Sequence, residues 1–282
     1  MTSESVVRAT GLTKVFDDRV AVADLDLVVG KGRVLGVLGP NGSGKSTTVR
    51  MLTGLLRPTS GSVELFGEPV TPESAPRLRA RIGVQTEANL YHRLTVAENL
   101  RTWGALHGLS RSATERRVSE VLEVVGLSDR RDSPVGALSK GLRQKAKIAR
   151  ALLSDPELIF LDEPTAGLDP EAALDVLGHL AKLRADGDTT IVLCTHQLHG
   201  LEDLCDDVVM LDRGRVVAAG EVTELVAAHW PDREYVIRVS EREVAEQVVA
   251  GLRAAGVTVP DAESTAPSLH DLYFALLSGE ES

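Results

Sequence analysis

The feature that most constrains the fold of this 282-residue chain is a glycine-rich loop between an apolar strand and a helix. The dense apolar run 34–38 predicts a strand covered on both faces. The next residues fit the pattern G-x-x-x-x-G-K-[ST]; they are Gly39, Pro40, Asn41, Gly42, Ser43, Gly44, Lys45, Ser46 and Thr47. The alternative is a chance glycine-rich turn, but a preceding strand and a following helix are the context that this motif requires. The sequence therefore predicts a phosphate-binding loop.

The residue types of this loop suit a nucleotide. Its glycines allow backbone N–H groups to turn inward onto phosphate oxygens, and the N-terminus of the following helix adds partial positive charge. Lys45 is expected to reach the outer phosphates, and the Ser46 hydroxyl can ligate Mg²⁺. The loop therefore predicts a bound nucleotide phosphate together with Mg²⁺.

Two acids follow a second apolar strand, at 158–161. Alone, paired acids at a strand end are more often a solvated turn. After a phosphate loop, however, a nucleotide-binding sheet needs one carboxylate for the metal and a second group to orient water. Asp162 is predicted to ligate Mg²⁺, and Glu163 is predicted to be the catalytic base.

Strands and helices alternate along the chain, which predicts an α/β fold with a parallel sheet. Alternation of Leu25, Leu27 and Val29 predicts a half-buried strand. A hairpin turn is expected at 213–214, between apolar runs 208–211 and 216–219. Further strands are predicted at 82–84, 158–161 and 191–194, and helices at 95–106, 115–125, 141–153 and 171–185.

The pattern breaks near 227–232. We therefore predict a main domain over residues 1–228 and a small C-terminal domain over 229–282. The second domain is expected to contain short strands at 235–239 and 257–259 and helices at 241–254 and 269–277.

Composition excludes several classes of function. The net charge of −10 would repel nucleic acid and the anionic face of a bilayer. The start shows no signal-peptide pattern, and all apolar runs are far shorter than the about 20 residues of a spanning helix. If the chain works at a membrane, other chains must span it. Cys194 and Cys205 are expected to be small buried hydrophobes in a reducing compartment.

Further motifs follow in a fixed order. The run 138–144, Leu-Ser-Lys-Gly-Leu-Arg-Gln, opens a predicted helix just ahead of the two acids, and Ala166-Gly-Leu-Asp169 follows them. Together with the phosphate loop, these residues resemble the signature, Walker B and D-loop motifs of ABC ATPases. Thr195-His196 is similar to the switch histidine of that family, and Phe16 to its adenine-stacking aromatic residue. The resemblance covers about residues 6–220.

The resemblance implies a P-loop NTPase fold with a helical subdomain, and an ATP-dependent head-to-tail homodimer. The signature of one copy, with Ser139 and Gly141, would complete the phosphate loop of the other, and Asp169 would belong to the shared site. Glu163 and His196 would be catalytic. ATP would then hold the two copies together, and hydrolysis would release them.

Two departures from the family pattern affect site residues. Lys140 replaces the first signature glycine and Leu142 the glutamine, a variant associated with the export branch. The glutamine expected after the strand at 82–84 falls on Glu87, whereas Gln85 lies two residues too early. Glu87 could still contact Mg²⁺ or water as a carboxylate, and the choice between the two residues stays open.

The stretches 47–61, 90–91 and 94–100 resemble bacterial drug- and antibiotic-resistance export ATPases, whose permease is a separate chain. The tail 268–276 is similar to theirs except at His270, although it could equally be a plain amphipathic helix. This implies a cytoplasmic subunit, peripheral on the inner face of the cell membrane, with residues 87–95 contacting the permease. The alternatives are an importer ATPase, a soluble non-transport ABC ATPase, and a binding module without turnover; Glu163 and His196 argue against the last.

Overall fold

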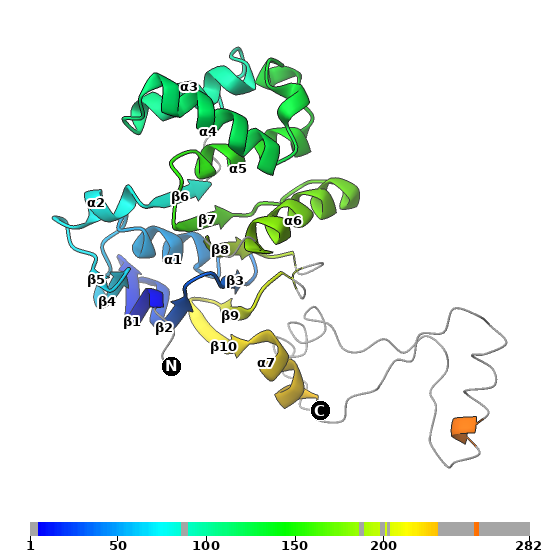
Figure 1. Cartoon of the computed structure of the whole chain (residues 1–282). Helices are drawn as coiled ribbons and strands as arrows, with labels where there is room; N and C mark the ends of the chain where they lie inside the picture. Colours follow the sequence, from blue (N-terminus) through cyan, green and yellow to red (C-terminus); the bar gives the residue numbers. More distant parts are fainter. Residues whose placement is uncertain are drawn as a thin grey trace. The chain divides into compact units, whose positions relative to one another are not determined.

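The computed structural model describes residues 5–85, 90–185, 189–197, 201, 204–230 and 251–253. The chain divides into two compact units, Met1–Val222 and Thr223–Ser282. Each is described by itself below. All the candidate site residues of the sequence belong to the first unit (Figure 1).

A six-stranded sheet forms the centre of the first unit, in the order β10-β9-β3-β8-β7-β6. All its neighbours are parallel except the antiparallel pair β9 and β10. The predicted parallel sheet and hairpin are thereby confirmed. The strands are β3 (Val34–Leu38), β6 (Ile82–Gln85), β7 (Leu158–Asp162), β8 (Thr190–Thr195), β9 (Asp207–Asp212) and β10 (Arg215–Glu221).

The order of these strands positions the chemistry. β3, β8 and β7 are consecutive neighbours and parallel, so their carboxyl ends lie side by side at one edge. All five residues of β3 are buried, as the apolar run predicted. The phosphate loop leaves β3, the paired acids end β7, and Thr195 ends β8. Three segments that are far apart in sequence are therefore brought to one place.

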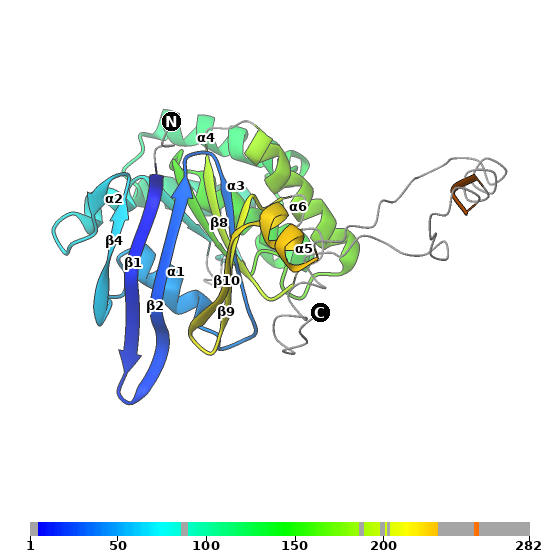
Figure 2. The ribbon, with the colours of Figure 1, turned by 90° about the horizontal axis from the view of Figure 1, so that it is seen from below.

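A second, antiparallel sheet has the order β2-β1-β4-β5. Its first two strands form a long hairpin, and Leu25, Leu27 and Val29 are buried as predicted. Figure 2 shows β1, β2 and β4 side by side, with α1 behind them. The strands are β1 (Ser5–Phe16), β2 (Arg19–Gly30), β4 (Ser60–Leu65) and β5 (Glu68–Pro69), and α1 is Lys45–Leu52. One apolar core joins side chains of both sheets and α1, which fixes the phosphate loop between them.

Three helices form the helical subdomain, above β6 and β7 in Figure 1. Each begins at a hydroxyl cap: Thr95, within a full capping box with Glu98, then Ser110 and Ser139. The helices are α3 (Val96–Leu106), α4 (Arg111–Val124) and α5 (Lys140–Leu152), with short 3₁₀ turns at Ser128–Arg130 and Val135–Ala137. The remaining helices of this unit are α2 (Ala75–Arg79) and α6 (Pro170–Ala185). The predicted helices are confirmed, although α4 begins four residues before the predicted start.

The second unit is described only in part. Helix α7 spans Val222–His229, and residues 251–253 are helical. The other elements predicted here, including the tail 268–276, lie outside the described residues. The domain boundary at 228/229 stays a prediction. In the part of the chain that the structure describes, no helix has the length and apolar character needed to cross a bilayer.

Candidate nucleotide site

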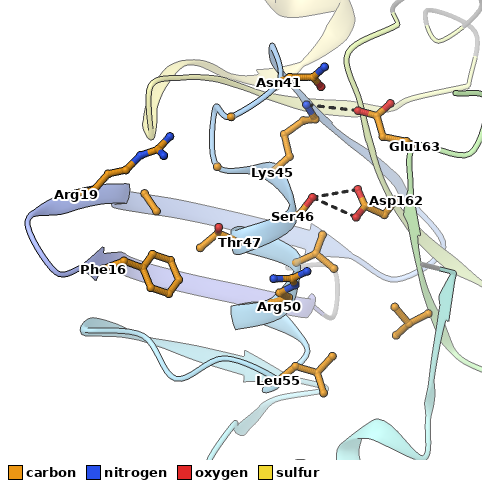
Figure 3. A pocket seen from close by; sticks show the side chains of 15 residues that line it. Phe16, Arg19, Asn41, Lys45, Ser46, Thr47, Arg50, Leu55, Asp162 and Glu163 are labelled. Atoms are coloured by element: carbon orange, nitrogen blue, oxygen red, sulfur yellow. Dashed lines mark hydrogen bonds and ion pairs between the residues drawn. The ribbon is translucent and has the colours of Figure 1, made fainter. Parts of the chain in front are cut away.

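A cavity of about 840 Å³ opens beside the phosphate loop. Its wall includes the N-terminal half of α1, the end of β1, the start of β2, and the two acids at the end of β7 (Figure 3). Of the predicted site residues, those that line it are Phe16, Asn41, Gly42, Gly44, Lys45, Ser46, Thr47, Asp162 and Glu163. The volume falls in the range of small-molecule sites.

The phosphate loop is held in shape by glycine conformations and by its lysine. Gly44, the N-cap of α1, has φ 112°, and a Cβ there would lie 2.5 Å from the Ala21 carbonyl oxygen. The buried Lys45 ammonium donates to the carbonyl oxygens of Gly39 at 2.7 Å and Pro40 at 3.2 Å. The loop therefore wraps around its own lysine, beside the amide groups that begin α1. This is an anion site of the kind that phosphates occupy.

The Ser46 hydroxyl lies 3.2 and 3.4 Å from the two carboxylate oxygens of Asp162. A hydroxyl beside a carboxylate gives the hard oxygen donors that Mg²⁺ prefers. Within the described ranges, no three His, Cys, Asp or Glu side chains gather as a metal site. The Ser46 hydroxyl and the Asp162 carboxylate fit a Mg²⁺ ion that takes its other ligands from a nucleotide and water.

Glu163 is held from several directions. Its backbone takes the left-handed conformation, with φ 52°, and its N–H donates to the Cys194 carbonyl at 2.8 Å. One carboxylate oxygen lies 2.9 Å from His196 Nδ1 and 3.5 Å from Lys45 Nζ. The other accepts a hydrogen bond from the Thr195 hydroxyl at 3.0 Å. A strained backbone over-determined by its neighbours is common at functional sites.

Both cysteines are buried, as predicted. Burial raises the pKa of the Cys194 thiol, and the nearby Asp162 carboxylate raises it further. Cys194 is therefore a neutral side chain beneath the acids, and its backbone carbonyl positions Glu163.

Aromatic and cationic side chains lie on the rim. Phe16, at the end of β1, is 45% exposed, with the Lys14 ammonium 5.1 Å from its ring centre. Arg19 begins β2, and its guanidinium lies near Gly42 of the loop. Arg50, one helical turn after Ser46, also lines the cavity (Figure 3). An open ring face suits stacking of a base, and the arginines add positive potential.

The signature residues lie elsewhere. Ser139, Gly141 and Asp169 do not line the cavity. The Ser139 hydroxyl caps α5 by accepting from Leu142 N at 3.3 Å, and the Asp169 carboxylate accepts from Ala172 N at 2.9 Å. The structure thus brings the phosphate loop, the acids and His196 together, whereas Ser139, Gly141 and Asp169 are not among the residues that line the cavity.

Glu87 and Gln85 are the two candidates for the glutamine position of the family, and only Gln85 lies within the described residues. Gln85 is 2% exposed, and its side-chain oxygen has no hydrogen-bond partner among the described residues. The cavity is lined by its neighbour Val84 instead. Gln85 does not face the site in this structure.

Sequence reasoning did not single out Arg19, Arg50 or Asn99, and it named Thr195 only as the neighbour of the switch histidine. Arg50 could have been found from its spacing of four after Ser46, which places both on one helix face. The buried Asn99 holds residues 91–95, because its side chain bonds the backbone of Tyr91, Leu94 and Thr95. No sequence signal marks it, since an asparagine on a capped helix normally faces solvent.

A phosphate loop at the end of a buried parallel strand, with the Asp162 and Glu163 carboxylates two strands away in the sheet, is the arrangement of a P-loop ATPase. The family model described as ABC transporter matches residues 22–166. The chain belongs to this family, and it is an ATP-binding and ATP-hydrolysing subunit.

Similar proteins include "Nod factor export ATP-binding protein I" of Cupriavidus pinatubonensis, 44% identical over 79% of this chain and 68% of that protein. The "Linearmycin resistance ATP-binding protein" of Bacillus subtilis is 33% identical over 88% of this chain and 79% of that protein. Among solved structures, cbiO1 of Clostridium perfringens, part of an ABC transporter complex, has a TM-score of 0.73 at 26% identity and covers 90% of this chain and 98% of its own. These comparisons confirm the fold class and the family that the ordered motifs predicted.

Proposed function

We propose that this chain is the ATPase subunit of an exporter and that it drives a separate membrane permease. The observation that carries the proposal is the arrangement around Glu163, whose carboxylate lies between Lys45 of the phosphate loop and His196. That arrangement suits hydrolysis rather than mere retention of a nucleotide. The direction of transport is supported by relatives whose names contain "export" or "resistance".

Roles follow from the geometry. Phe16 stacks the adenine, and the amides of the loop with Lys45 hold the phosphates. Glu163 accepts a proton from the attacking water, and His196 orients that carboxylate from 2.9 Å. Ser46 and Asp162 would hold Mg²⁺, which neutralises phosphate charge when bound. Glu87 is proposed to face the site when ATP is bound, with Gln85 as the other candidate.

The site is completed by a second copy of the chain. Within one chain, Ser139 is outside the cavity and exposed, with Gly141 beside it, at a helix N-terminus that can face a phosphate. We propose that the partner copy brings this end of α5, together with Asp169, to the γ-phosphate of ATP. ATP would therefore stabilise a head-to-tail homodimer on the inner face of the membrane, where the permease lies.

Glu163→Gln tests both the base and the dimer. The amide keeps the size of the side chain but cannot take a proton, so ATP hydrolysis should fall at least about 100-fold while ATP still binds. Light scattering should then show a mass near twice 30.1 kDa with ATP and the monomer mass without it. The matched control is Glu157→Gln, a half-exposed carboxylate paired with Arg81, which should hydrolyse ATP as the wild type does.

Wild-type activity in Glu163→Gln would remove Glu163 from its role. An unchanged mass with saturating ATP would contradict the shared site.

A further inference from the structure

Thr195 occupies an unusual position for a residue at the end of a strand. It is the last residue of β8 and is only 1% exposed, yet its hydroxyl points at the acid on the neighbouring strand end rather than into the core. The hydroxyl oxygen lies 3.0 Å from Glu163 Oε2, the oxygen that neither His196 nor Lys45 contacts.

The direction of the hydroxyl proton is fixed by a second hydrogen bond. The backbone N–H of Gln197 donates to the same Thr195 oxygen at 3.0 Å. Because a carboxylate oxygen and a backbone N–H offer the hydroxyl one acceptor and one donor, the single hydroxyl proton points at the carboxylate and a lone pair faces the N–H. Gln197 is held in turn, since its side-chain oxygen accepts from Thr165 Oγ1 at 3.1 Å. Thr165 follows Glu163 by two residues. The hydrogen bonds from Glu163 through Thr195 and Gln197 therefore lead back to the segment that contains Glu163.

From this geometry we infer that Thr195 is a positioning residue for the catalytic carboxylate, and that its hydroxyl fixes the plane in which Glu163 presents its oxygens. The inference rests on the proposed role of Glu163 as base. His196 and Lys45 contact one oxygen, and that leaves the carboxyl group able to rotate about its last bond. The bond from Thr195 to the other oxygen removes this rotation. A base must present one lone pair in the right direction, and misorientation lowers the rate without weakening ATP binding.

The alternative is a purely structural hydroxyl that satisfies the Gln197 amide. The two roles differ in what they predict. A structural role would lower stability or ATP affinity whether or not Glu163 is a carboxylate. A positioning role would lower kcat only, and only while the carboxylate is present.

The test uses Thr195→Val, which replaces the hydroxyl with a methyl group of similar size. We expect kcat for ATP hydrolysis by the full chain to fall about tenfold, with KM within about twofold of wild type. Thr195→Ser should restore most of the rate. The matched control is Thr114→Val, another buried threonine, whose hydroxyl donates only to the Ser110 carbonyl; its kcat should be unchanged.

The decisive measurement repeats Thr195→Val in the Glu163→Gln background. The residual hydrolysis rate of the double variant should equal that of Glu163→Gln, because no carboxylate remains to be oriented. A further tenfold loss there, a raised KM, or a wild-type kcat for Thr195→Val would overturn the inference. If Thr195→Val does not fold by thermal melting, Thr195→Ala removes the same hydroxyl and is judged in the same way. Full activity of Glu163→Gln alone would instead defeat the proposed function.

Discussion

The cavity wall and the N-terminal end of α5 are built in opposite ways. Around the cavity, Glu163 contacts both Lys45 and His196, and Lys45 is 6% exposed. At the end of α5, Ser139 and Lys140 are exposed, and the serine bonds only its own helix among the contacts described. The groups around the cavity have their partners within the chain, whereas Ser139 and Lys140 at the end of α5 are exposed to solvent. This difference is what the proposed homodimer requires: one copy would bind the phosphates, and the α5 end of a second copy would complete the site.

Lys45→Ala should have the largest effect, because it disrupts the phosphate loop, whose contacts are complete within one chain. The variant removes the loop's buried cation and its bonds to the Gly39 and Pro40 carbonyls. We expect ATP affinity to fall about 100-fold and hydrolysis to be lost, since charge-assisted bonds contribute about 1.5–3 kcal/mol each. Titration with a fluorescent ATP analogue measures the affinity. Lys182→Ala, an exposed lysine on α6, is the control, and near wild-type ATP affinity in Lys45→Ala would contradict this account.

Ser139→Ala should have an intermediate effect, because it alters only the exposed N-terminal end of α5 and leaves the cavity unchanged. ATP affinity of the monomer should stay within about twofold, while hydrolysis should fall at least about tenfold as the dimer is weakened. Loss of the helix cap itself costs about 1 kcal/mol of stability.

That structural cost has a matched control in the same subdomain. Ser110 caps α4 with the same geometry, its hydroxyl accepting from Ala113 N at 3.2 Å. Ser110→Ala should melt at a temperature similar to Ser139→Ala and yet hydrolyse ATP as the wild type does. Equal hydrolysis by both variants would mean that Ser139 is only a cap.

Tyr91→Ala should have the smallest effect on hydrolysis. Of the three apolar residues predicted to contact the permease, Tyr91 is 54% exposed, Leu94 is half-buried and Leu90 is only 4% exposed. Leu90 therefore packs within its own domain, and Tyr91 is the side chain that offers a contact. The isolated variant should keep its ATPase rate but lose co-purification with the permease. Arg93→Ala, exposed in the same loop, is the control; full co-purification by Tyr91→Ala would place the contact elsewhere.

The sequence predicted the central sheet well because its signals are local. A fully buried strand such as β3 is a dense apolar run, and the phosphate loop needs particular residue types at fixed spacing. The antiparallel sheet was largely missed, since β1 mixes buried and exposed residues around several register shifts. Arg111 to Thr114 were missed at the start of α4 because that turn is polar and its cap is a lone serine.

The sequence predicted which residues belong to the site, but it did not predict how they contact one another. Lys45, Asp162 and Glu163 carry motif signals, whereas the bond from Thr195 to Glu163 depends on β7 and β8 being neighbours in the sheet. That pairing joins residues 32 positions apart. The burial of Gln85 was equally hidden, because a polar residue at the end of a strand gives no indication of which side it faces.

The Asn99 amide stiffens the loop of residues 91–95, which carries the exposed Tyr91. Its hydrogen bonds to the backbone of residues 91–95 are joined by bonds from Val135 N to Leu94 O and from Gly136 N to His92 O. The loop is therefore stiff and is fastened to the start of α3. If the proposed permease contact at Tyr91 exists, a displacement there would be passed to the start of α3 through these hydrogen bonds rather than absorbed within the loop.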